Sequence, residues 1–146
     1  MKTPWLPTTG PIPQGFETAR LRVRPLTIHD LVKDYDAVMS SRAELRGVFP
    51  GSDWPRDDLT LEQDLIDLAW HQKEFQSHGS YTYTVVSLDE SQVLGCIYLY
   101  PPSDPTTQAD LLWWVRTSEL GTGLKEHLRE ALQRWISDDW GLLIRA

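Results

Sequence analysis

Cysteine is almost absent from this chain, because Cys96 is the only one among its 146 residues. A single cysteine forms no intrachain disulfide and no cluster of thiolate metal ligands, and within a strand pattern it is best read as a core residue. Long hydrophobic runs are absent as well. No segment approaches the roughly 18 to 20 apolar residues of a membrane-spanning helix, and residues 1–5 lack the apolar stretch of a secretory signal. We therefore expect a cytoplasmic protein with no membrane partner.

Positive charge is also in short supply. The chain has 14 Lys and Arg against 21 Asp and Glu, a net charge of −7. Nucleic-acid binding depends on basic residues that release counterions from phosphates, so this balance predicts no nucleic-acid partner. Arg20, Arg22 and Arg24 form the one visible basic row, and their spacing predicts one side of a strand, either solvated or ion-paired. The acidic surplus favours a cationic substrate such as an amine.

The composition is that of a globular protein. Hydrophobic residues make up 40% of the chain and charged residues 24%, and the length is typical of one domain. Proline is concentrated near the beginning, at positions 4, 7, 11 and 13, where it prevents a helix or a central strand. We therefore expect a proline-rich arm over residues 1–15 and a single domain over residues 16–146.

Hydrophobic periodicity and helix-capping residues predict the order β-α-α-β-β-β-α-β. The expected elements are a strand over 19–25, two helices that begin after Thr27 and Thr60, a hairpin over 81–100, a strand over 109–116, an amphipathic helix over 124–136 and a last strand over 140–144. This order is typical of a domain in which helices cover a sheet.

The most informative segment runs from Trp113 to Lys125, a predicted strand that leads through glycines into a helix. Gly121 and Gly123 allow close approach of the backbone to a ligand, and the N–H groups of a helix's first turn attract an anion such as a pyrophosphate. Considered alone, the loop is better explained as a plain strand-to-helix turn that uses glycine for its backbone angles.

The order of elements resembles that of the GNAT N-acetyltransferase superfamily, and two further segments resemble its ribosomal-protein alanine acetyltransferase branch. These are Glu17 to Thr27, followed by Asp30, and Leu94 to Leu99. The resemblance implies an α/β (α+β) fold with a mixed, largely antiparallel sheet flanked by helices. It also implies acetyl-CoA as cosubstrate, with transfer of the acetyl group to a primary amine of a small molecule or a protein.

In this family, backbone amides of the glycine segment bind the pyrophosphate of coenzyme A. The resemblance therefore implies these cofactor-binding residues: Trp114, Val115, Leu120, Gly121, Thr122, Gly123, Leu124 and Lys125. Val115 and Gly123 match the family's motif, whereas Leu120 stands in place of an arginine or glutamine and Lys125 in place of a small residue. The ammonium of Lys125 can itself pair with a phosphate.

The family often uses a carboxylate on the strand before this loop as general base, and Asp110 is the nearest match. The alternative for Asp110 is a solvated acid at the start of a strand. The four histidines, His29, His71, His78 and His127, have no metal-ligand spacing, so we expect no metal and interpret them as surface or packing residues.

Family members usually continue past the last predicted strand with a helix and two further strands, whereas this sequence ends at Ala146. In the family, that region often supplies a tyrosine general acid and one wall of the acceptor site. A noncatalytic ligand-binding or dimerisation module of the same fold is therefore the alternative function. We also expect a homodimer, because an unpaired strand edge over 140–144 is an association site.

Overall fold

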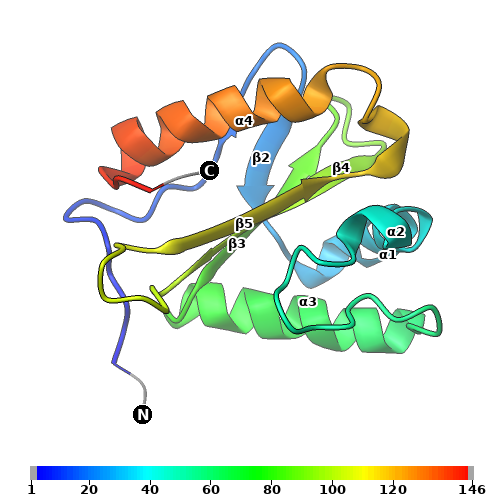
Figure 1. The fold of residues 1–146 in the computed structure, drawn as a ribbon, viewed down its shortest axis with the longest axis horizontal. Helices are drawn as coiled ribbons and strands as arrows, with labels where there is room; N and C mark the ends of the chain where they lie inside the picture. The colour runs from blue at the N-terminus through cyan, green and yellow to red at the C-terminus, as the bar shows by residue number, and fades with distance from the viewer. Residues whose placement is uncertain (1–2, 145–146) are drawn as a thin grey trace.

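An antiparallel sheet of five strands forms the middle layer of the structure, a computed structural model that describes residues 3–144. The strands lie side by side in chain order: β1 (Phe16–Glu17), β2 (Arg22–Pro25), β3 (Tyr81–Val86), β4 (Val93–Tyr100) and β5 (Asp110–Val115). The helices are α1 (Leu31–Ser40), α2 (Arg42–Leu45), α3 (Leu61–Gln76) and α4 (Leu124–Trp135). Figure 1 shows α4 on one face of the sheet and α1, α2 and α3 on the other, which confirms the predicted fold class.

Both predicted capping boxes are present. Asp30 accepts a hydrogen bond from the Thr27 N–H (2.9 Å) at the start of the 3-10 turn η1 (Ile28–Asp30), which leads into α1. Thr60 and Gln63 exchange the same pair of bonds at the start of α3. These bonds satisfy N–H groups that a helix start otherwise leaves open. No helix within residues 3–144 is long and apolar enough to cross a membrane.

The sheet separates two hydrophobic cores, because successive side chains of a strand point to opposite faces. On β4, Ile97 and Leu99 pack in the core beneath α4, whereas Cys96 and Tyr98 pack in the core beneath α1 and α3. Cys96 is buried, as its strand pattern predicts.

The proline-rich arm lies against the sheet. Trp5 packs its ring on Tyr81 with the centroids 5.6 Å apart, and the Tyr81 hydroxyl donates to the Trp5 carbonyl (2.5 Å). The Tyr83 hydroxyl donates to the Pro13 carbonyl (2.6 Å). Tyr81 and Tyr83 belong to the core beneath α4, so the arm covers part of that core.

The first predicted strand, over 19–25, is shorter in the structure. The Thr18 hydroxyl accepts from the N–H groups of Arg20 and Leu21 (3.1 and 3.2 Å), and this turn delays the ladder until Arg22. Arg22 and Arg24 both form ion pairs with Glu90, at 2.7 and 2.8 Å, as an ion-paired strand face predicts. Arg20 lies outside the strand and is not part of that row.

The predicted last strand over 140–144 is wrong. The helix that begins at Leu124 continues through a π-helical turn, η3 (Ile136–Trp140), and ends at Gly141, whose φ is 68°. The Leu142 N–H then bonds back to the Ile136 carbonyl (3.1 Å). Because the chain folds back, Trp140 and Leu142 are both buried in the core beside α4, and no ladder forms. A left-handed glycine at a helix end favours such a reversal.

Candidate functional site

The edge strand β5 leads directly into the predicted phosphate-binding loop. The Arg116 N–H donates to the Leu94 carbonyl (2.7 Å), and β4 pairs with β5 in continuous register from that point. In an antiparallel ladder alternate residues bond to the neighbouring strand, so Leu111, Trp113 and Val115 point their N–H and C=O groups away from β4. Among residues 3–144, no strand pairs with that side of β5.

The loop after β5 leads into the first turn of α4, where backbone N–H groups have no hydrogen-bond acceptor among the described residues. A short 3-10 turn, η2 (Thr117–Glu119), precedes Gly123, whose φ of 82° is left-handed and suits glycine. Within the described part of the chain, the backbone N–H groups of Leu124, Lys125 and Glu126 have no acceptor. Such groups, at the positive end of the helix dipole, form an anion-binding geometry.

Two basic side chains lie near this helix start. Arg20 donates to the Thr122 carbonyl (3.1 Å), so the turn before β2 brings a guanidinium to the loop. Lys125 pairs with Glu44 of α2 at 3.0 Å, and both side chains are about one third exposed, at 34% and 28%. A phosphate that bound Lys125 would therefore have to compete with Glu44.

The structure brings together some of the predicted cofactor-binding residues and separates others. Leu120, Gly121, Thr122, Gly123, Leu124 and Lys125 lie together at the start of α4. Trp114 and Val115 are 1% exposed and belong to the cores, and the Trp114 indole N–H donates to the Tyr98 hydroxyl (3.0 Å). Val115 can therefore offer a ligand only its outward backbone groups, whereas the backbone groups of Trp114 point toward β4.

Asp110 lies at the opposite end of β5 from the glycine loop. Strand geometry puts about 17 Å between the two ends of a six-residue strand. The Asp110 carboxylate accepts from the Ser103 N–H (3.1 Å) and lies across the ladder from Tyr100. Both residues line an open cavity of about 520 Å³ together with Leu112, Leu143 and other neighbours.

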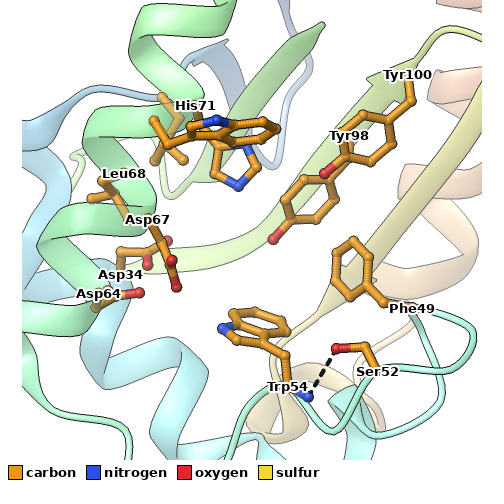
Figure 2. A pocket seen from close by; sticks show the side chains of 12 residues that line it. Asp34, Phe49, Ser52, Trp54, Asp64, Asp67, Leu68, His71, Tyr98 and Tyr100 are labelled. Atoms are coloured by element: carbon orange, nitrogen blue, oxygen red, sulfur yellow. Dashed lines mark hydrogen bonds between the residues drawn. The ribbon is translucent and has the colours of Figure 1, made fainter.

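A second cavity, of about 350 Å³, lies between α1, α3, β4 and the loop over residues 46–60 (Figure 2). Three carboxyl groups form one side of it, Asp34 from α1 and Asp64 and Asp67 from α3. The remaining walls are largely aromatic and comprise Phe49, Trp54, Trp70, His71, Tyr98 and Tyr100. We call this site the acid cavity.

The carboxyl groups of the acid cavity are hard to ionise. Burial raises the pKa of Asp34 well above its usual range, and the neighbouring charge and hydrogen bond of Asp64 raise it further. Burial raises the pKa of Asp64 too, although its hydrogen bond with Asp34 acts in the opposite direction. For Asp67, burial raises the pKa against a lowering by a hydrogen bond from Trp54. The protonated form of these carboxyl groups is therefore favoured more than that of an exposed carboxyl.

His71 is neutral and held in place. Burial lowers its pKa to about 4, and its Nδ1 is hydrogen-bonded to the Thr82 hydroxyl (3.0 Å). Its ring lies 5.5 Å from the Tyr98 ring, between centroids. The interpretation of His71 as a surface or packing residue therefore misses its place in the cavity wall.

Sequence reasoning missed the acid cavity as a whole. One signal was present, because Asp64, Asp67 and His71 follow the i, i+3, i+7 spacing of one helix face. Asp34 lies 30 positions before Asp64, and only the packing of α1 against α3 brings them together. Within residues 3–144, no group of three or more His, Cys, Asp or Glu side chains has an arrangement that could hold a metal ion.

A comparison with protein families decides the family. The family model described as an acetyltransferase (GNAT) domain matches residues 20–143, which is most of the chain. The chain belongs to the GNAT acetyltransferase family. No curated protein matches its sequence significantly.

Solved structures of other GNAT proteins share its fold at low sequence identity. The ribosomal-protein-S5-alanine acetyltransferase from Vibrio fischeri is 16% identical with a TM-score of 0.65, and the match covers 88% of this chain and 69% of that one. The microcin C7 self-immunity acetyltransferase, in complex with acetyl-CoA and AMP, is 11% identical with a TM-score of 0.66, covering 90% and 71%. A ribosomal L7/L12 alpha-N-protein acetyltransferase in complex with coenzyme A is 16% identical with a TM-score of 0.62, covering 81% and 64%.

These fold neighbours include ribosomal-protein acetyltransferases, in agreement with the branch that the segments Glu17 to Thr27 and Leu94 to Leu99 resemble. At 11 to 16% identity the likeness is one of fold. What this GNAT domain binds and transfers therefore has to be argued from its own residues.

Proposed function

We propose that this GNAT domain is an acyl-CoA-dependent N-acetyltransferase that transfers an acetyl group from acetyl-CoA to a primary amine. The observation that carries the proposal is the open edge of β5 running into the unpaired amides of Leu124, Lys125 and Glu126. An extended ligand with a diphosphate at one end fits this arrangement. Two fold neighbours were solved with coenzyme A or acetyl-CoA bound, which supports the choice of ligand.

The cosubstrate's diphosphate would bind at the start of α4. Donors there are backbone amides, so the replacement of the family's usual residue by Leu120 costs little. Arg20 adds a guanidinium next to the loop, a group well suited to phosphate. The outward N–H and C=O groups of Leu111, Trp113 and Val115 would pair with the ligand's amide-containing arm as a neighbouring strand would.

The reaction is a direct transfer. A neutral amine attacks the thioester carbonyl, a C–N bond forms as the C–S bond breaks, and the departing thiolate takes up a proton. An outward amide of β5 would donate to the developing oxyanion, which lowers the barrier because the donor is already in place. Asp110 is our candidate for accepting the ammonium proton, directly or through water, because its carboxylate lines the open cavity at the far end of β5.

Turnover tests this function. Purified protein mixed with acetyl-CoA and a set of primary amines should release free thiol continuously, and mass spectrometry should find the acetylated amine. Asp110→Asn should lower kcat by about a hundredfold, the usual contribution of a general base. Ser103→Ala is the matched control, because Ser103 contacts Asp110 through its backbone N–H alone.

A noncatalytic module remains the second candidate, and the Lys125–Glu44 ion pair is the observation that favours it. This pair places a carboxylate next to the proposed phosphate site. Binding of coenzyme A without thiol release from acetyl-CoA, across all amines tested, would select this alternative.

A further inference from the structure

The acid cavity gathers three carboxyl groups that have no basic partner among the described residues. Within residues 3–144, Asp34, Asp64 and Asp67 take part in none of the ion pairs. Among the described residues that line the wall, His71 is the only basic side chain, and it is neutral at physiological pH because its pKa is about 4. Burial disfavours the ionised form of these carboxyl groups, and a cation bound from solution would stabilise that form.

A buried oxygen in the wall lacks a donor. Asp64 is 1% exposed, and its Oδ2 atom has no hydrogen-bond partner. Figure 2 shows the Asp64 carboxyl beside those of Asp34 and Asp67, on the side of the cavity formed by α1 and α3. Nearly all buried polar atoms in proteins are hydrogen-bonded, so a ligand that donates N–H to this oxygen would complete the site.

The other walls suit an organic cation. Phe49 packs edge-on against both Trp54 and Tyr98, with ring centroids 5.4 and 4.9 Å apart. Aromatic faces attract ammonium groups, and their apolar area suits the methylene groups of an alkyl chain. A volume of about 350 Å³ lies at the lower end of the range for small-molecule sites, which favours a small molecule over a protein segment.

The cavity also reaches toward the proposed reaction site. Its wall ends at Tyr100, which lines the neighbouring cavity together with Asp110. In Figure 2, Tyr100 lies across the cavity from the three carboxyl groups. An ammonium held against carboxylates stays protonated, so it cannot be the nucleophile. The reacting amine must therefore be a different group of the same ligand, at the Tyr100 end.

We propose that the acid cavity is the acceptor site and that it selects an aliphatic diamine. One ammonium binds Asp64 and its neighbours Asp34 and Asp67, and the second amino group lies near Tyr100, where it is acetylated. This inference rests on the proposed function for the transfer step. Binding of the diamine does not require the cosubstrate, so the two proposals can fail separately.

The test compares two isosteric ligands. Cadaverine and hexylamine have the same number of heavy atoms, and only cadaverine carries a second amino group. Calorimetry without acetyl-CoA should show cadaverine binding at least about tenfold more tightly, the factor expected of one charge-assisted hydrogen bond. Thiol release in the presence of acetyl-CoA should show the same preference in KM, with a smaller change in kcat.

Three variants locate the effect. Asp64→Asn and Asp67→Asn should each reduce the cadaverine preference about tenfold or more. Asp53→Asn is the matched control, because it removes the same charge from an exposed carboxyl of the adjacent loop that is absent from the cavity wall. Circular dichroism would check that each variant is folded.

Equal affinity for the two amines, or a preference that survives both Asp64→Asn and Asp67→Asn, would overturn the inference. A cavity that binds a divalent metal and no amine would overturn it as well. Cadaverine binding without any thiol release would support the diamine site and reject the acetyltransferase function. Thiol release with no preference for diamines would support the acetyltransferase function and reject the diamine site.

Discussion

The proposed cosubstrate site and the proposed acceptor site are formed by different kinds of chemical group. The loop from Leu120 to Lys125 offers backbone amides at a helix start, so its chemistry depends on conformation more than on side-chain identity. The acid cavity depends on particular side chains, Asp34 and Asp64, which are buried and have no ion-pair partner within residues 3–144. A cosubstrate site made of backbone amides can therefore tolerate a side-chain substitution, as at Leu120, whereas a specificity site made of carboxyl groups cannot.

The largest effect should come from blocking the backbone site. Gly123→Asp adds a negative side chain where a diphosphate approaches, and we expect a loss of coenzyme A affinity of at least about a hundredfold with the domain still folded. Gly47→Asp is the matched control, because Gly47 is also left-handed (φ 93°) and has open space around it. If Gly123→Asp binds as tightly as the parent, the loop is not the phosphate site.

In the acid cavity, replacement of Asp34 should change the stability of the folded protein and its dependence on pH. Folding raises the pKa of Asp34, so between the ordinary carboxyl value near 4 and the raised value the folded protein keeps a proton that the unfolded chain releases. Stability therefore falls as pH rises through this window. Asp34→Asn is isosteric and has no proton to lose, so its melting temperature should exceed the parent's by about 3–5 °C at pH 8 and by less at pH 5.

Thermal unfolding at the two pH values measures this difference, with Asp53→Asn as control for the change in net charge. A variant that melts below the parent at pH 8 would show that the Asp34 carboxyl stabilises the fold. The same variant should bind cadaverine less well, which would separate the functional role of the carboxyl from its structural cost.

A smaller effect is expected at Lys125, the residue whose side chain can add an ammonium to the backbone amides of the proposed phosphate site. Lys125→Ala removes a cation and leaves Glu44 unpaired near the phosphates, so coenzyme A binding should weaken about two- to fivefold and depend less on salt. Glu44→Gln should strengthen binding by a similar factor. Tighter binding in Lys125→Ala would identify this lysine as an obstruction and favour the noncatalytic module.

The homodimer remains a prediction, but the candidate interface is now the open edge of β5 instead of the segment over 140–144. The segment over 140–144 has no strand edge, whereas β5 is unpaired on one side within residues 3–144. Pairing through β5 would bury the groups assigned to the cosubstrate. Sedimentation equilibrium at micromolar concentration should find a dimer, and coenzyme A should dissociate it if β5 forms the interface. A monomer at all concentrations would contradict the prediction.

Sequence was most informative where local chemistry decides the structure. The capping boxes at Thr27 and Thr60, the hairpin of β3 and β4, and the glycine loop before α4 all depend on neighbours within a few residues. The segment over 140–144 misled because a short run that alternates Trp140, Leu142 and Ile144 fits a strand as well as the end of a buried helix.

The acid cavity was beyond local inference for a different reason. Each carboxyl taken alone has the pattern of a solvated helix residue, and their burial follows from the packing of α1 against α3. Carboxyl groups that lack a basic partner in the folded structure cannot be recognised from the sequence, apart from the shared helix face of Asp64, Asp67 and His71.

Calorimetric titration of the purified chain with acetyl-CoA, and separately with coenzyme A, tests whether the start of α4 binds the cosubstrate. We expect saturable binding of both ligands at one site per chain, with Gly123→Asp abolishing the signal and Gly47→Asp preserving it. Absence of binding by either ligand in the folded parent protein would contradict this expectation.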